Sequence, residues 1–498
     1  MNVNPITRLD YPDPDVIRVE DTYYMVSTTM HFMPGCEILQ SFDLVHWEHV
    51  TYVYETLDHT DAQQLKSGQN IYGQGMWAAS LRYHEGRFCI CFVANDTRKT
   101  YLYTSEKIDG PWKKQLIEGF YHDGSLLFDE DGRNYIVYGN DEIWITELNE
   151  DLTAPKKDGL HRLLVSDHKN PELGYEGSHI QKINGYYYIF LIHSLRDRWM
   201  RTEACFYSDS LEGEFTGGDV LCDDRGYCGQ GVAQGGIVDT PDGKWYAMLF
   251  QDSGAVGRIP ILVPVTWKDH FPFFGQNGHV PEEIEVHSTR PGYIYQPLVG
   301  SDDFCNGLLP HWQFNHDPDP RYYHLDALQG TYTITTREVC TELTQAVNTL
   351  TQRMSYPSCA AEVTVDASAL KEGDVAGLCA LQSCYAAVGI TKHHGKYEVL
   401  MLDKKEDGIL DMTEGTVVES HQMDFRLEAD FCNMKDEVRC YYRVNKGDWL
   451  PIGTVHKLYF KLDHFTGCRF GLFCYAAEET GGSACFRDFK YYDVDEIS

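Results

Sequence analysis

The sequence has no long apolar run and comparatively few basic residues. Its strongest apolar run, residues 186–192, is far too short to cross a bilayer, and residues 1–10 lack the basic start and apolar core of a signal peptide. Asp and Glu total 75 against 42 Lys and Arg, which gives a net charge of −33 with His neutral. Such a negative field repels phosphate backbones and anionic lipid surfaces. We therefore expect neither a membrane nor a nucleic-acid partner.

The sequence also lacks any Cys-X-X-Cys pair, although it has 16 cysteines. This absence argues against zinc ribbons and thioredoxin-like redox chemistry. Several cysteines, such as Cys89 and Cys91, lie within apolar stretches, where a thiol packs as a small hydrophobic group. Since no feature directs export, we expect reduced cysteines and a cytoplasmic protein.

Long stretches with the apolar period of a helix are missing too, and short apolar runs take their place. Aromatic residues make up 13% of the chain, and many runs end in Asp-Gly or Asn-Gly. Both features are typical of a mostly β protein. At 498 residues, the chain has the length of one large or two medium domains.

One strand pattern occurs five times in the first 250 residues. Each copy is an apolar strand, a polar turn that usually contains Gly, and an aromatic-rich strand, at intervals of roughly 45 to 65 residues. Such β-hairpins bury both faces only when they pack side by side around an axis. The pattern therefore predicts a five-bladed β-propeller. The copies are residues 15–26, 79–90, 125–136, 178–189 and 236–247.

Acidic residues lie in phase with this repeat. Eleven or twelve residues before an aromatic residue of each second strand stand Asp13, Trp77, Asp123, Glu176 and Gln234. Equivalent positions on the innermost strands of a propeller surround one end of the central channel. Three of the five are acidic, so the repeat predicts a cluster of carboxylates in one place.

This cluster has a chemical use. Asp13 and Asp123, each taken alone, are ordinary turn residues, and Glu176 between glycines suggests a close approach of the backbone. Their shared phase favours a joint role, because like charges held together are unfavourable for stability. Two carboxylates at a fixed separation perform glycoside hydrolysis: one protonates the departing oxygen, and the other activates water or attacks the sugar. A third acid raises the proton affinity of the general acid.

The repeat ends before a second β domain. Residues 288–297 lack clear alternation and are typical of a connecting strap, and alternating strands return after Asp302. These strands predict a sandwich of two antiparallel sheets. We place the catalytic propeller at residues 1–298 and the sandwich at residues 299–498.

Ordered motifs along nearly the whole chain resemble glycoside hydrolase family 43, in particular its β-xylosidase and α-L-arabinofuranosidase branch with a C-terminal β-sandwich. The resemblance implies an all-β fold, a five-bladed β-propeller followed by a concanavalin-like β-sandwich. The motifs are Tyr11-Pro-Asp-Pro-Asp15, Phe32-Met-Pro-Gly35, His122-Asp-Gly-Ser125, Glu176-Gly-Ser-His179, Ala233-Gln-Gly-Gly236, Gly254-Ala-Val-Gly-Arg258 and, in the second domain, Gly373-Asp-Val-Ala-Gly377.

The resemblance implies an exo-acting, inverting hydrolase that releases terminal β-D-xylosyl or α-L-arabinofuranosyl units, or both, from xylan-derived oligosaccharides. In it, Asp13 is the general base, Glu176 the general acid, and Asp123 the residue that tunes and orients that acid. Inversion places base and acid about 6.5–9.5 Å apart. Substrate contacts are expected from four further residues: Phe32, Trp77, Gln234 and Arg258. The sequence does not separate xylosidase from arabinofuranosidase.

The resemblance leaves metal binding undecided. The family's Trp-Ala-Pro is Trp77-Ala-Ala here, and no match is found to the His that holds a divalent cation in some members; Ser253 lies where we would look for one. We expect that no cofactor is required, and the sequence decides neither a divalent cation nor a homo-oligomer. A β-fructosidase is disfavoured because its Arg-Asp-Pro triplet is absent. A sugar-binding propeller without chemistry is the alternative.

Overall fold

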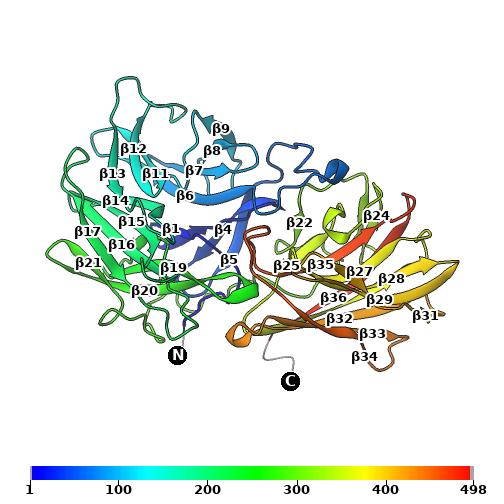
Figure 1. The fold of residues 1–498 in the computed structure, drawn as a ribbon. Helices are drawn as coiled ribbons and strands as arrows, with labels where there is room; N and C mark the ends of the chain where they lie inside the picture. The colour runs from blue at the N-terminus through cyan, green and yellow to red at the C-terminus, as the bar shows by residue number, and fades with distance from the viewer. Residues whose placement is uncertain (1–2, 494–498) are drawn as a thin grey trace.

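The computed structural model describes residues 3–493, which form two β domains side by side (Figure 1). The first domain contains five four-stranded antiparallel sheets in chain order, as the repeat predicted. Their strands are β1 (Asp15–Val19), β2 (Thr22–Val26), β4 (Gly35–Ser41) and β5 (Glu48–Tyr54); β6 (Met76–His84), β7 (Arg87–Ala94), β8 (Lys99–Ser105) and β9 (Lys113–Ile117); β10 (Ser125–Phe128), β11 (Asn134–Asn140), β12 (Glu142–Leu148) and β13 (His161–Ser166); β14 (Glu176–Ile183), β15 (Tyr186–Ser194), β16 (Arg201–Ser208) and β17 (Thr216–Leu221); β18 (Ile237–Asp239), β19 (Trp245–Asp252), β20 (Arg258–Lys268) and β21 (Phe271–Phe274).

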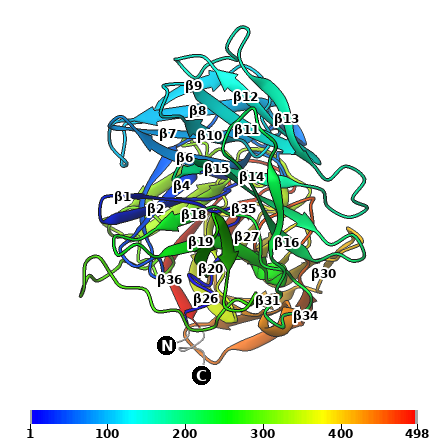
Figure 2. The ribbon, with the colours of Figure 1, turned by 90° about the vertical axis from the view of Figure 1, so that its left-hand side faces the viewer.

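Figure 2 shows the first domain from the side away from the second domain. The first strand of each sheet lies innermost in this domain. Neighbouring first strands contact one another from β18 through β1, β6 and β10 to β14. The ring closes where Gln181 Nε2 of β14 donates to the Ile237 carbonyl of β18 at 2.7 Å. Buried apolar residues from adjacent sheets pack together between the blades. The predicted five-bladed propeller is therefore confirmed.

A charge network fills the centre of the ring. Arg82 of β6 pairs with Asp15 of β1 at 2.8 Å and donates to Ser125 Oγ of β10 at 2.7 Å. His179 of β14 lies 3.1 Å from the other Asp15 oxygen. Each of these buried polar groups thus meets a partner from another blade, which fixes the blades relative to one another.

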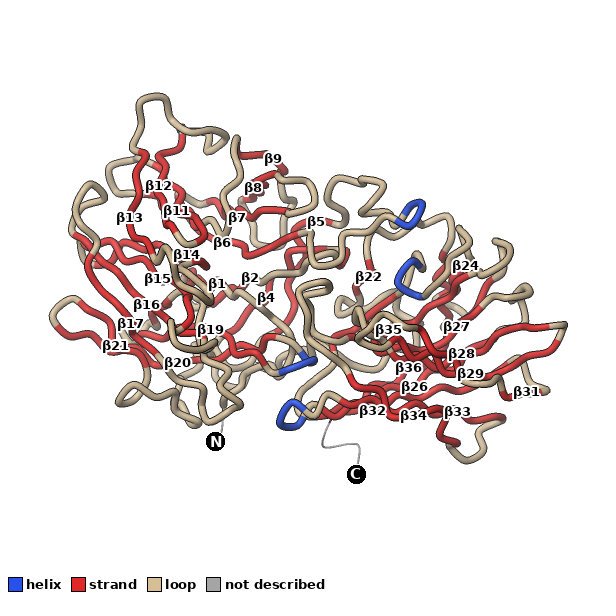
Figure 3. The backbone as a smooth tube through the Cα atoms, in the orientation of Figure 1, coloured by secondary structure: helices blue, strands red, loops and turns tan. Residues whose placement is uncertain are grey.

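The second domain is a sandwich of two antiparallel sheets with one large apolar core between them. The described residues contain four short 3-10 helices (Figure 3). Two lie in the propeller part of the chain, η1 (Lys66–Gly68) and η2 (Gly254–Val256), and two in the sandwich, η3 (Leu343–Gln345) and η4 (Cys432–Met434). The nine-stranded sheet contains β3 (Phe32–Met33), β22 (Gln313–Asn315), β25 (Leu350–Arg353), β35 (Arg469–Tyr475), β27 (Val375–Leu381), β28 (Ala386–His393), β29 (Lys396–Lys404), β30 (Leu410–Met412) and β31 (Thr416–Val418). The seven-stranded sheet contains β23 (Tyr323–Asp326), β24 (Thr331–Thr335), β36 (Ser483–Asp493), β26 (Ser358–Asp366), β32 (Gln422–Asp430), β33 (Glu437–Val444) and β34 (Leu450–Lys457).

A connecting segment, residues 275–312, separates the last propeller strand from β22, the first strand contributed by the C-terminal part of the chain. The boundary that we predicted between residues 298 and 299 falls within this segment. Residues 289–296 run back across the first blade, where Tyr295 Oη accepts from the Phe42 amide at 2.9 Å and Arg290 pairs with Asp21 at 2.9 Å. This strap attaches the connection to the propeller.

The two domains share backbone and side-chain contacts. The short strand β3, which leaves the first blade, pairs with β22 and so extends the sandwich sheet. Glu37 of β4 and Arg353 of β25 form an ion pair at 2.9 Å in which both side chains are almost fully buried. Water is therefore excluded from the domain interface at this ion pair.

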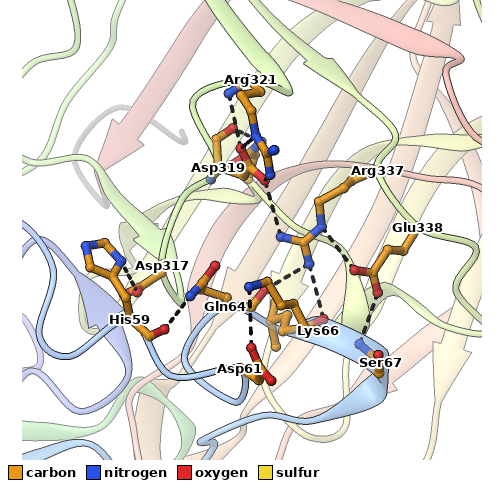
Figure 4. A network of polar contacts seen from close by, with 12 residues as sticks. His59, Asp61, Gln64, Lys66, Ser67, Asp317, Asp319, Arg321, Arg337 and Glu338 are labelled. Carbon is orange, nitrogen blue, oxygen red and sulfur yellow. Dashed lines mark hydrogen bonds and ion pairs between the residues drawn. The ribbon is translucent and has the colours of Figure 1, made fainter.

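A second set of polar contacts joins the loop after β5 to the sandwich (Figure 4). His59 lies 3.0 Å from the buried carboxylate of Asp317, and Arg337 donates to the Gln64 carbonyl at 2.8 Å. The Ser67 amide donates to Glu338 at 3.1 Å. Burial raises the pKa of Asp317 to about 6, although His59 opposes the shift. The contacts hold this loop, which precedes β6, against the second domain.

The 16 cysteines are all free thiols in the structure. Within residues 3–493, no helix has the length and apolar character that crossing a membrane requires.

Candidate active site

The chain turns in the same way where it enters each innermost strand. Asp13, Asp123 and Gln234 have φ values of 53°, 48° and 64°, and Ala78 and Gly177, which follow Trp77 and Glu176, have φ values of 32° and 66°. Glycine adopts this left-handed region freely and Asp tolerates it, whereas Ala and Gln are held there by their surroundings. The shared turn places the phased side chains around one end of the channel, as the repeat predicted.

Two of the three predicted acids meet at this end. The Gly177 amide donates to Asp123 Oδ2 at 3.0 Å, which joins the residue after Glu176 to Asp123. His122 Nε2 lies 3.5 Å from Asp123 Oδ2 and 3.4 Å from Glu176 Oε2. One donor atom each from His122, Asp123 and Glu176 lies within 4.8 Å of the others. Asn140 Nδ2 also donates to Glu176 Oε2 at 2.6 Å.

The third acid, Asp13, is held on both oxygens. Arg258 Nη1 of β20 donates to Asp13 Oδ1 at 3.0 Å, and Thr28 Oγ1 donates to Oδ2 at 2.5 Å. Thr28 also accepts from the Ala78 amide at 2.8 Å, so the first and second blades are joined at this point. Asp13 and Arg258 are both buried. The base candidate therefore has a fixed orientation.

The charges of this group act on one another. Burial raises the pKa of Asp123 to about 6; His122 counteracts this shift, and the negative charges of Glu176 and Asp13 add to it. Burial alone would lower the pKa of His122, but Asp123 and Glu176 outweigh it and raise that pKa to about 9. Near pH 7, a protonated imidazole therefore stands between two carboxyl groups.

The sandwich contributes one side of the site. Its loop after β34 carries Phe465, whose ring centroid lies 5.4 Å from that of Trp77 and 4.3 Å from the Arg258 guanidinium carbon. Trp77 is half-buried and stands 6.2 Å from the His122 ring. Among the described residues, Trp77 Nε1 has no hydrogen-bond partner, and neither do Arg258 Nε and Nη2.

Gln234 is buried beside the acid cluster. The backbone amide of Gln234 donates to Glu203 Oε2 at 2.7 Å. The Gln234 side chain packs against Gly177, and a Cβ added at Gly177 would lie 2.7 Å from the Gln234 side-chain carbons. Glycine is thus required next to Glu176. The substrate contacts expected of Trp77, Gln234 and Arg258 remain predictions, now with side chains placed at the site.

Phe32 lies elsewhere than we expected. Its ring is fully buried on β3, with the Arg469 guanidinium carbon of the sandwich 3.4 Å from the ring centroid. No part of Phe32 is open to a sugar in this structure. The repeat gave no information here, because β3 lies in the connection between β2 and β4 and is paired by the second domain.

Four residues at the site were not singled out from the sequence: Thr28, His122, Arg201 and Phe465. His122 directly precedes Asp123, so the motif itself offered a signal. Arg201 forms an ion pair with Asp252. Burial and the nearby Arg258 lower the pKa of Arg201 to about 10, against the charges of Glu176 and Asp13, which places a second arginine beside the acids.

A metal centre has limited support. Ser253, the position suggested by the sequence, is a buried hydroxyl that donates to the Gln251 carbonyl at 3.4 Å, and one neutral oxygen does not make a cation site. Among the described residues, His122, Asp123 and Glu176 are the one group with the spacing of metal ligands. His122 must release its proton before its ring nitrogen can bind a metal, so a cation at these residues would displace the proton network.

Comparisons with known proteins identify the family of both domains. The model of the glycosyl hydrolases family 43 matches residues 3–272, and the model of the beta xylosidase C-terminal concanavalin A-like domain matches residues 301–492. The chain belongs to glycosyl hydrolases family 43. It is a glycoside hydrolase that needs no cofactor, and the alternative of a sugar-binding propeller without chemistry receives no support.

Individual relatives cover both domains. The chain is 26% identical to a beta-xylosidase of Formosa agariphila over 99% of its own length and 89% of that protein. It is 24% identical to a non-reducing end alpha-L-arabinofuranosidase of Bacteroides ovatus, over 82% of this chain and 79% of that one. A solved bifunctional GH43-CE protein of Bacteroides eggerthii superposes with a TM-score of 0.93 at 42% identity. The match covers all of this chain but 64% of that one, so the chain spans about two thirds of its length.

Proposed function

We propose that the protein is an exo-acting, inverting glycosidase that removes terminal β-D-xylosyl or α-L-arabinofuranosyl units, or both, from xylan-derived oligosaccharides. The observation that carries the proposal is the convergence of the acid pair Asp123 and Glu176 with the buried, arginine-held Asp13 at one end of the channel. The names of the relatives, a beta-xylosidase and an arabinofuranosidase, support the two sugars.

The roles follow from the surroundings of each acid. Asp13 accepts a proton from water while the water oxygen attacks the anomeric carbon. Glu176, which is more exposed than Asp13, donates its proton to the glycosidic oxygen as the bond between that oxygen and the anomeric carbon breaks. Asp123 accepts a hydrogen bond from the Gly177 amide and so holds the backbone beside Glu176 in place, which orients the acid. Exchange with solvent then returns a proton to Glu176 and removes one from Asp13.

Arg258 and Trp77 are the candidate substrate contacts beside the acids, and Phe465 of the sandwich packs against both. A site closed on one side by the second domain favours chain ends over the interior of a polymer. This argument supports the exo mode.

The experiment is a steady-state comparison of aryl β-xyloside, aryl α-L-arabinofuranoside and xylobiose with one preparation, with the first-formed anomer followed by NMR. We expect hydrolysis of at least one aryl glycoside, inversion at the anomeric carbon, and a loss of kcat by about 10²–10⁴-fold in Asp13→Asn. Retention of configuration would overturn the assignment of Asp13 as base.

We also propose a cytoplasmic location, because 16 free cysteines suit a reducing compartment and an enzyme there would finish imported oligosaccharides. Fractionation of the source cells tests it. The acidic charge of −33 supports a protein that avoids nucleic acid and anionic membranes. Light scattering decides whether the protein is a homo-oligomer.

A further inference from the structure

The fourth blade carries an exposed tryptophan on the same end as the general acid. Glu176 pairs with Ile192 near the end of β15, and Ser194 pairs with Arg201 at the start of β16. The loop between β15 and β16, residues 195–200, therefore projects from the end of the blade at which Glu176 stands. Trp199 lies on this loop and is 45% exposed, so its ring is open to a ligand.

Trp199 is joined to the acid cluster through one side chain. The guanidinium carbon of Arg201 lies 5.3 Å from the centroid of the Trp199 ring, a cation–π distance. Arg201 is nearly buried, pairs with Asp252, and is close enough to Glu176 and Asp13 for their charges to act on it. The tryptophan thus packs on an arginine whose pKa responds to the charges of Glu176 and Asp13.

The loop is anchored at both ends. The Leu195 amide donates to the Met200 carbonyl at 3.1 Å, which closes the base of the loop, and Met200 itself is buried. Arg196 pairs with the buried carboxylate of Asp167 and donates to the Lys169 carbonyl at 3.4 Å. An aromatic side chain on an anchored base loses little conformational freedom on binding a ligand.

The position of Trp199 suits a contact with the leaving-group sugar. The general acid protonates the oxygen that leaves with the departing sugar, so that sugar lies on the side of Glu176, which is the fourth blade. On another side, Phe465 of the sandwich packs against Trp77 and Arg258. The C–H face of a sugar packs on an aromatic face as an apolar surface.

We propose that Trp199 is the platform on which the leaving-group sugar of an oligosaccharide packs during hydrolysis. The inference rests on the proposed function and adds to it a residue that determines the preference for oligosaccharides. Glycosides whose leaving group is not a sugar make no use of this platform.

The experiment compares an oligosaccharide with a glycosyl fluoride of the same terminal sugar. The oligosaccharides are xylobiose and 3-O-α-L-arabinofuranosyl-xylobiose, and the readout is the ratio of kcat/KM for the oligosaccharide to kcat/KM for the fluoride. In Trp199→Ala, we expect this ratio to fall roughly tenfold, the size of one good aromatic contact. In Trp199→Phe, which keeps an aromatic face, we expect most of the ratio to return.

Tyr83→Ala is the matched control. Tyr83 is also 45% exposed, but it lies at the other end of its blade, because β6 begins beside Trp77 and Tyr83 is its penultimate residue. We expect this variant to keep the wild-type ratio. An unchanged ratio in Trp199→Ala, or an equal loss on oligosaccharide and fluoride, would overturn the platform while the proposed function stands. A wild-type enzyme that cleaves neither oligosaccharide would overturn both.

Discussion

Arg258 and Asp13 are 245 positions apart in the chain, and Arg258 Nη1 donates to Asp13 Oδ1 at 3.0 Å inside the protein. Arg258 begins β20 of the last blade and Asp13 lies just before β1 of the first blade, so the contact forms only when the propeller ring closes. Since Thr28 binds the second oxygen, Asp13 keeps one orientation, and Arg258 retains two unused donors beside it. The orientation of Asp13, the candidate base, therefore depends on closure of the propeller ring.

Replacing Arg258 by lysine tests this relationship. Arg258→Lys keeps the positive charge but loses the planar fork that binds Asp13 Oδ1, so Asp13 loses its fixed orientation. We expect kcat/KM on the aryl glycoside to fall by about 100-fold, as for a misplaced catalytic group. Arg290→Lys, which alters the surface pair with Asp21, is the control and should leave kcat/KM as in the wild type. An equally small change of kcat/KM in both variants would show that Arg258 does not orient Asp13 for catalysis.

Glu176 is tested by changing the leaving group. A general acid matters most when the departing oxygen is basic, as in a disaccharide, and little when it leaves readily, as dinitrophenolate does. We expect Glu176→Gln to lose about 10²–10⁴-fold of kcat/KM on xylobiose or an arabinofuranosyl xylobiose, and much less on the 2,4-dinitrophenyl glycoside. The exposed Glu172 lies in the loop just before β14, and Glu172→Gln should match the wild type on both substrates. Equal losses on the two substrates would deny Glu176 the role of acid.

The sequence predicted the propeller because its information is local. Each blade begins with a hairpin whose turn residues, such as Asn184 and Gly185, have the positive φ values that a tight turn requires. The spacing of the acids followed from the same repeat, since equivalent positions meet at one end of a ring. The carboxylates and Gln234 were therefore found without knowledge of any tertiary contact.

The missed residues share a different property. Phe465 comes from the second domain, which has no period in common with the propeller, and Arg201 begins a third strand, outside the two strands that were compared. Phe32 was misplaced for a related reason: its strand β3 is completed by β22, and no local pattern predicts a pairing partner about 280 residues away. Contacts between domains depend on how the domains pack, which the hydrophobic period of a single strand does not encode.

His122 predicts a pH-dependent contribution to stability. Its pKa is about 9 in the folded protein, above the 6.5 of the unfolded chain, so its stabilising charge is fully present below about pH 6.5 and is lost as the pH rises through 9. We expect the melting temperature of His122→Gln to lie below that of the wild type at pH 6, with the gap narrowing toward pH 10. Differential scanning calorimetry of both proteins across this range measures it. A gap that stays constant would show that His122 stabilises by packing rather than by charge.

The buried pair of Glu37 and Arg353 predicts the strength of the domain interface. Burial alone would raise the pKa of Glu37, but Arg353 and His49 outweigh it and hold that pKa at about 2, below the unfolded value. The stabilisation is therefore present above about pH 4.5 and is lost as the pH falls toward 2. The substitution Glu37→Gln leaves the Arg353 charge buried without the carboxylate that neutralises it.

We expect Glu37→Gln to lower the free energy of unfolding by about 3–5 kcal/mol at pH 7, measured by urea denaturation. The double variant Glu37→Met with Arg353→Met removes both charges and should recover much of this loss, because the cost comes from the uncompensated arginine. Glu20→Gln, an exposed change in the same blade, is the control. A loss below about 1 kcal/mol in Glu37→Gln, as for a surface pair, would mean that water reaches Arg353 and that the interface opens without unfolding.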